Sequence, residues 1–336
     1  MNVMAGQKRR SVLLTIAGVR ETGISIFIFL LVVVVSLRSP YFLTVSNIKD
    51  VLMDIAILSI VAIGEAMVII TRGIDLSVAS ILALTGMIVG MMHSSHPTVT
   101  PGVALLLGMG IGAILGSLNG LLITKGRIPP IITTLGTMSI YRGLVFVISG
   151  GAWVDAHEMT REFIGMTKGE ILFVPNLVFM AGIVALIFYY FLNYTPIGRQ
   201  IYALGSNPTA ARVAGIHVHR NLFLVYLLSG ILSSLGGVLW ISRYASAQSD
   251  TAVGFELQAI AAAVVGGVST LGGSGTIPGV LLGSLLLGIV VNALNLVHIS
   301  PFWKLAVQGL IILAAVVTDA LLSRRLQQSR SAEGTS

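Results

Sequence analysis

The chain has no cysteine and few charged residues. The first absence excludes disulfide bonds, a thiol nucleophile and thiolate metal sites. Charged residues make up only 10% of the 336 residues, and hydrophobic residues make up 55%. Charged residues account for about a quarter of an ordinary soluble domain. The composition therefore excludes such a domain and indicates an integral membrane protein.

Motifs for nucleotide hydrolysis and metal binding are also missing. No G-x-x-x-x-G-K-[ST] loop occurs, and LGGSGT at 271–276 has the glycines without the lysine that contacts phosphate. The pair His157-Glu158 lacks the second histidine of a zinc-binding helix, and the other histidines are scattered. We therefore expect that this chain is not an enzyme and that it binds no metal and no cofactor of its own. The net charge of +7 is dispersed without a basic run, so we expect no nucleic-acid partner.

Long apolar segments dominate what is present. A helix that rises about 1.5 Å per residue needs about 20 mostly apolar residues to cross a bilayer. Ten windows meet this requirement, although the eighth is short: 22–37, 51–70, 76–92, 103–123, 131–148, 172–192, 221–242, 257–268, 276–297 and 302–322. The sequence predicts an all-α integral membrane protein, a glycine-rich bundle of about ten transmembrane helices.

The distribution of Lys and Arg predicts the orientation of this bundle, because these residues are retained on the cytoplasmic side of short loops. With both termini inside, 13 of the 20 Lys and Arg are cytoplasmic and 7 are external. We therefore expect a cytoplasmic N-terminal segment at 1–21, a transmembrane domain at 22–325, and a disordered cytoplasmic tail at 326–336, which is polar and without periodicity. Two loops are long, an outer one at 150–171 and an inner one at 193–220.

The 38 glycines concentrate within the predicted spans. Small residues let helices approach closely in lipid, so tight packing explains most of them. A second interpretation is that helices break near Gly272, Gly273, Gly275 and Pro278, where freed backbone groups would have to be covered by protein or water. The sequence leaves both interpretations open.

Few ionisable groups lie deep in the predicted spans, and Glu65 is the most suggestive of them. It is as consistent with a structural hydrogen bond to a neighbouring helix as with a role in a transport pathway. Uncharged polar groups are more plentiful and suit a neutral, polyhydroxylated solute, although bonding between helices explains them equally well. The pathway residues that we predict are Glu65, Asn119, Thr133, Thr134, Tyr141 and Asn292.

The inner loop reads YTPIGRQIYALGSNPTAARVAGIHVHRN and contains, at 210–215, the A-A-x-x-x-G core of the coupling loop of bacterial ABC importer permeases. Three other sequence blocks occur in the same order as in such permeases: TRGIDLSVAS at 71–80, IPPIITTLGTMSIYRG at 128–143 and AIAAAVVGGVSTLGGSGTIPG at 259–279. Together they resemble the permeases of the ribose, xylose, arabinose and autoinducer-2 family of sugar ABC importers. The resemblance covers essentially the whole chain.

This resemblance implies a multi-pass permease of the bacterial inner (plasma) membrane that pairs with a second copy or a paralogue. It would receive a monosaccharide from a periplasmic or lipoprotein binding protein and be driven by a separate cytoplasmic ATPase, which uses the ATP. The strings SGGAWVDAHEMT at 149–160 and ISPFW at 299–303 look most similar to rhamnose permeases, with autoinducer-2 permeases next. The motif positions implied to contact the ATPase are Asn207, Thr209, Ala210, Ala211, Gly215 and Ile216, with Thr209 where other importers have Glu.

An alternative from another class is a self-sufficient secondary transporter that couples a small neutral solute to protons. In that hypothesis Glu65 would carry the proton, and uptake would need neither an ATPase nor a binding protein.

Overall fold

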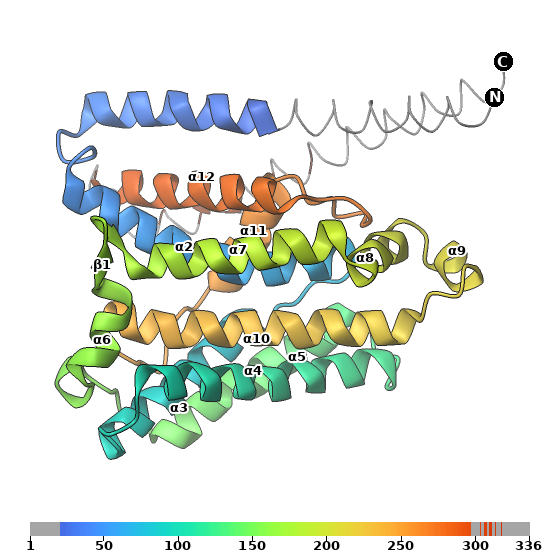
Figure 1. Ribbon diagram of the computed structural model, residues 1–336, viewed down its shortest axis with the longest axis horizontal. Helices are drawn as coiled ribbons and strands as arrows, with labels where there is room; N and C mark the ends of the chain where they lie inside the picture. Colours follow the sequence, from blue (N-terminus) through green and yellow to red (C-terminus); the bar gives the residue numbers. More distant parts are fainter. Residues whose placement is uncertain are drawn as a thin grey trace.

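The computed structural model describes residues 21–296 and a few positions between 303 and 317. Its long helices lie side by side with roughly parallel axes (Figure 1). Among the described residues, eight helices are long and apolar enough to cross a membrane: Glu21–Arg38, α2 at Val45–Ile70, α3 at Val78–Ser95, α4 at Pro101–Thr124, α5 at Pro130–Ser149, α7 at Asn176–Tyr194, α10 at Val218–Tyr244 and α12 at Ile277–Leu296. The prediction of an all-α membrane bundle is confirmed.

Two of the predicted spans are wrong in extent. The window 172–192 begins inside a hairpin, in which β1 (Glu170–Ile171) pairs antiparallel with β2 (Val174–Pro175), and α7 starts only after Pro175. The window 257–268 corresponds to α11 (Phe255–Val265), which has 11 residues and is too short to span alone. Both errors arise because hydropathy does not distinguish a hairpin or a half-length helix from a span. The tenth predicted span, 302–322, lies largely outside the described residues.

The two long predicted loops are folded and lie at opposite ends of the bundle (Figure 1). The loop at 150–171 contains the short helices η1 (Ala156–Glu158) and α6 (Arg161–Lys168), followed by the hairpin. The loop at 193–220 contains α8 (Pro196–Ser206) and α9 (Pro208–Val213). We refer to the two ends of the bundle as the α6 end and the α9 end.

Helix α2 occupies the centre of the bundle, and 94% of its most apolar window is buried. Apart from Glu65, its sequence from Ile55 to Ile70 has no charged residue on any side, which is typical of a helix surrounded by others. It packs against α10, α11, α12 and α7, while α10 also packs against α4 and α3. In contrast, only 33% of the α4 window, 28% of the α5 window and 22% of the α7 window are buried. These outer helices therefore present apolar faces to lipid or to another chain.

The close approach of α4 and α10 depends on glycine. A Cβ atom at Gly112 or Gly116 would overlap backbone atoms of α10, including the carbonyl oxygens of Gly230 and Tyr226. A Cβ atom at Gly230 would overlap the backbone of α4 in turn. The tight-packing interpretation of the glycines holds at this crossing.

We predict that Gly116→Ala destabilises the protein by about 1–3 kcal/mol, because the added methyl group can be accommodated only if the two helices separate. The measurement is the thermal unfolding midpoint of the detergent-solubilised protein. Gly110→Ala is the matched control on the same helix, since no atom lies within 4 Å of a Cβ at that position. Equal midpoints for the two variants would contradict the close-packing account.

Candidate functional site: a buried polar cluster and a capped terminal helix

The carboxylate of Asp75 lies at the centre of a buried polar cluster. Asp75 belongs to the non-helical segment 71–77, which joins α2 to α3. Its Oδ1 accepts hydrogen bonds from the backbone N–H of Ser77 (3.0 Å) and from the Ser77 hydroxyl (2.6 Å). Its Oδ2 accepts one from the Ser229 hydroxyl of α10 (3.1 Å). All three residues are fully buried.

Three other helices are bonded to the same segment. Glu65 of α2 accepts a hydrogen bond from the backbone N–H of Asp75 (3.1 Å). The side-chain amide of Asn119, on α4, donates to the Ser77 hydroxyl (2.8 Å). The Thr134 hydroxyl of α5 lies 3.1 Å from the carbonyl oxygen of Ile74, to which it donates. The 71–77 segment is therefore tied to α2, α4, α5 and α10 at once.

The cluster lies well inside the bundle. Ser229 is 11 residues from the start of α10, which places it roughly 16 Å from that end at the rise of an α-helix. Non-helical backbone is tolerated at such depth only where protein covers it. Within the described part of the chain neither Glu65 nor Asp75 forms an ion pair. Hydrogen bonds therefore have to compensate the desolvation of these two carboxyl groups.

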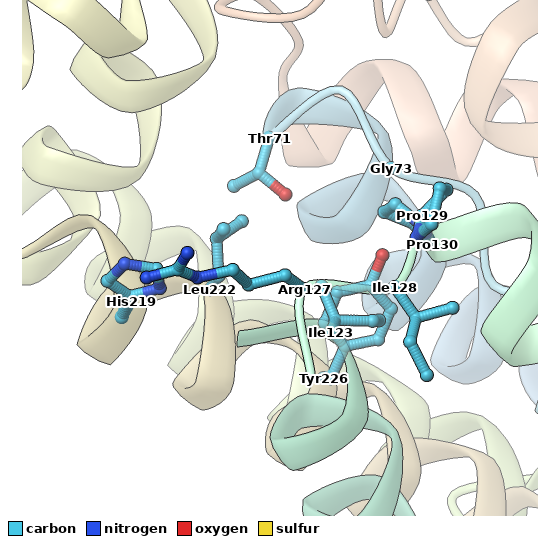
Figure 2. Close-up of a pocket in the computed structure, with 10 residues that line it drawn as sticks. All are labelled: Thr71, Gly73, Ile123, Arg127, Ile128, Pro129, Pro130, His219, Leu222 and Tyr226. Atoms are coloured by element: carbon cyan, nitrogen blue, oxygen red, sulfur yellow. The ribbon is translucent and has the colours of Figure 1, made fainter. Parts of the chain in front are cut away.

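A cavity of about 330 Å³ opens beside the 71–77 segment at the α9 end. Figure 2 shows the hydroxyl groups of Thr71 and Tyr226 on its walls. The Tyr226 hydroxyl is buried and has no hydrogen-bond partner among the described residues. Arg127 and His219 also line the cavity, and both are exposed. The cavity lining combines hydroxyl groups, an aromatic ring, an imidazole and the guanidinium group of Arg127.

The structure brings together some of the predicted pathway residues. Glu65, Asn119 and Thr134 all reach the 71–77 segment, and Thr133 is buried next to Thr134 on α5. Glu65 therefore forms a structural hydrogen bond, as one of the two interpretations predicted. Its donor is the backbone N–H of Asp75, which lies in the segment directly after α2 and not on a neighbouring helix.

The other two predicted pathway residues are not bonded to the 71–77 segment. The hydroxyl of Tyr141 donates to the carbonyl of Leu115 on α4 (3.1 Å). Asn292 pairs with Asn47 near the start of α2. Asn47 and Glu65 are 18 residues apart on that helix, a separation of roughly 27 Å. Asn292 therefore belongs to the opposite end of the bundle.

Helix α9 is capped at both ends. The Asn207 side chain accepts hydrogen bonds from the backbone N–H groups of Thr209 (3.1 Å) and Ala210 (3.0 Å). At the other end Gly215 has φ +80°, its N–H donates to Arg212, and the N–H of Ile216 donates to the carbonyl of Ala211. This pair of bonds is the Schellman arrangement, in which glycine takes the left-handed position. The predicted A-A-x-x-x-G segment is thus a short, well-terminated helix.

The predicted coupling residues do not all lie on the surface. Asn207, Thr209, Ala210 and Gly215 are exposed, Ile216 is half-buried, and Ala211 is only 4% exposed. Val213, at the last turn of α9, is 86% exposed. Ala211 therefore anchors α9 to the bundle, while the remainder of the helix faces outward at the α9 end.

Sequence reasoning missed Asp75, Ser77, Ser229 and Tyr226. The predicted third span begins at residue 76, so Asp75 falls between two predicted spans and was not predicted as a buried group. A single carboxylate between two apolar residues, Ile74 and Leu76, was the available signal.

Comparison with known proteins gives consistent matches. The family model "branched-chain amino acid transport system / permease component" matches residues 47–316. The ribose import permease protein of Escherichia coli (strain K12) is 39% identical over 307 residues, covering 91% of this chain and 95% of that protein. The ribose import permease protein of Bacillus subtilis (strain 168) is 42% identical over 300 residues, covering 89% and 92%.

A relative named for another sugar is similar over the same extent. The D-allose transport system permease protein of Escherichia coli (strain K12) is 36% identical over 301 residues, covering 89% of this chain and 91% of that protein. No solved structure matches the chain.

We predict that Asp75→Ala lowers the thermal unfolding midpoint more than Ser229→Ala does. The first change leaves the Ser77 and Ser229 hydroxyls without their acceptor, and each unsatisfied buried group costs about 1–3 kcal/mol. The second removes one donor and leaves the two bonds from Ser77 in place. Glu65→Gln retains an oxygen acceptor for the Asp75 N–H and should have the smallest effect. A Ser229→Ala variant at least as unstable as Asp75→Ala would contradict this account.

Proposed function

Because this chain belongs to the permease family of branched-chain amino acid transport systems, we propose that it is the membrane-spanning subunit of an ABC importer that carries a monosaccharide inward. The relatives reported above are transport permeases and not enzymes, and they carry the names of ribose and D-allose. Its several long apolar helices accord with a multi-pass protein of the inner membrane. A neutral sugar is also consistent with the predicted pathway residues, which are uncharged polar residues apart from Glu65.

The observation that carries this proposal is the capped helix α9 at one end of the bundle. A permease without a phosphate-binding loop needs a rigid surface through which a separate ATPase can act. The doubly capped helix, with the exposed side chains of Asn207, Thr209 and Val213, is such a surface. We place the α9 end in the cytoplasm, where ATP is bound and hydrolysed by the partner subunit. This is also the side that the Lys and Arg distribution assigns to the 193–220 loop.

The cavity beside the 71–77 segment is our candidate for the inner end of the sugar pathway. Ligand pockets start at about 300 Å³, and the cavity of about 330 Å³ reaches this size. The unpartnered Tyr226 hydroxyl would bond a sugar hydroxyl, and its ring offers an apolar face. Four of the predicted pathway residues lie behind the cavity, deeper in the bundle: Glu65, Asn119, Thr133 and Thr134. Tyr141 would support the α4–α5 contact through its bond to Leu115, and Asn292 would act at the opposite end of the bundle or only in packing.

Further subunits complete the proposed assembly. A binding protein would deliver the sugar at the α6 end, where η1 and α6 form a folded external surface. A second permease, either a copy or a paralogue, would pack on an outer helix such as α5. The small residues Gly136 and Gly143 of α5 have open space around them, and small residues favour close helix contacts in lipid. Rhamnose remains the specific substrate that the loop strings suggest.

The test is reconstitution in proteoliposomes with the genomically adjacent ATPase and binding protein. We expect ATP-dependent uptake of a labelled monosaccharide only when all three components are present. Rhamnose, ribose, D-allose, L-arabinose and autoinducer-2 measured side by side would rank the substrates. Uptake by this chain alone, following a proton gradient, would instead support the secondary transporter.

Within this assay Gly215→Val should lower uptake by roughly tenfold, because a left-handed residue with a side chain is strained by about 1–2 kcal/mol and the last turn of α9 would fray. Gly215→Asn is the matched control, since Asn adopts the left-handed conformation more readily. Normal uptake with Gly215→Val would contradict the role assigned to α9.

A further inference from the structure

Arg72 connects the 71–77 segment to the end of α8. Its Nε donates to the carbonyl oxygen of Gly205 (2.6 Å), and its Nη2 donates to that of Ser206 (2.7 Å). The residue that follows Ser206 is Asn207, the N-cap of α9. A single guanidinium group therefore holds the chain at the point where α8 ends and α9 begins. The planar fork of Arg suits such a two-carbonyl contact, whereas a lysine ammonium is a single point charge.

The backbone around this contact is unusually close. A Cβ atom at Gly205 would overlap the carbonyl oxygen of Ile70, and one at Gly272 would overlap the Arg72 side chain. The N–H of Gly273 donates to the same Ile70 carbonyl (2.9 Å). Three segments that are distant in sequence thus meet with their backbones in close contact, with the Arg72 side chain between them, so a shift of one segment would displace the others.

Arg72 itself has φ +67°, a left-handed conformation that is costly for a residue with a side chain. Glycine would adopt this backbone conformation without strain. The guanidinium group, which glycine lacks, makes the two bonds to the α8 terminus. These two bonds therefore explain why arginine occupies position 72 despite its strained backbone conformation.

A second bond stabilises the same arrangement. The hydroxyl of Tyr202 on α8 donates to the carbonyl of Gly275 (2.9 Å). Burial raises the pKa of Tyr202 to about 12, so the hydroxyl keeps its proton and remains a donor at physiological pH. Helix α8 is therefore fixed both to the 71–77 segment and to the glycine-rich segment that follows α11.

Only two residues separate Arg72 from Asp75, and Asp75 is bonded to Ser77, the N-cap of α3, to Ser229 of α10 and to the Glu65 side chain. The 71–77 segment also forms a wall of the cavity, through Thr71 and Gly73. We infer that Arg72 is the positioning residue that transmits displacement of α9 to the buried polar cluster and the cavity. This inference rests on the proposed function, because it requires that an ATPase moves α9.

The experiment uses the reconstituted complex of permease, ATPase and binding protein, and it measures sugar uptake and ATP hydrolysis on the same vesicles. For Arg72→Gly and Arg72→Ala we expect assembled complexes that hydrolyse ATP within about twofold of wild type, while sugar moved per ATP falls at least about tenfold. Arg72→Lys should give an intermediate ratio. The Gly and Ala variants differ in backbone strain but share the loss of the fork, so their ratios should be alike.

Lys125→Ala is the charge control, since it removes an exposed cation at the C-cap of α4, on the same end of the bundle. It should leave the ratio unchanged. A wild-type ratio in Arg72→Gly, or a parallel fall of uptake and hydrolysis in all three Arg72 variants, would overturn the inference. If the wild-type complex itself showed no ATP-dependent uptake, the proposed function would fail instead, so the two failures are distinguishable.

Discussion

The carboxylate of Asp75 is enclosed by an apolar bundle, where an unbonded charge or acceptor would be costly. Its bonding partners come from Ser77 and from Ser229 of α10, and the neighbouring Ser77 is held by Asn119 of α4. Because these bonds can form only when α3, α4 and α10 lie in register, the carboxylate fixes the relative positions of these helices. The glycine crossing of α4 and α10 allows the approach that the bonds require.

The sequence predicted the helical membrane bundle well, because long apolar runs with charged ends have few alternatives in lipid. The glycine of the A-A-x-x-x-G segment occupies a left-handed position at Gly215, and the coupling role of this segment stays a prediction. Prediction from the sequence failed where composition does not determine conformation. Leu172 and Phe173 are apolar, yet they form the turn of a hairpin instead of the start of α7.

The buried cluster could be predicted only in part for a related reason. A helical window identifies polar residues on helices, such as Glu65 and Asn119, but it places the residues between windows in water. The 71–77 segment turns back into the bundle, so Asp75 is buried although it is not helical. The contacts of Arg72 with Gly205 and Ser206 join residues more than 130 positions apart, and no local sequence pattern predicts them. Such long-range contacts arise from packing rather than from spacing along the chain.

The central claim is that the α9 end and the buried cluster move as one unit. Hydrogen–deuterium exchange on the assembled complex, with and without ATP, tests this most directly by following the amides of 71–77 beside those of 205–216. The account predicts that ATP changes the exchange of both segments together, with the N–H groups of Asp75 and Ser77 losing or gaining protection in step with α9. A change confined to 205–216, with 71–77 unaltered, would contradict it.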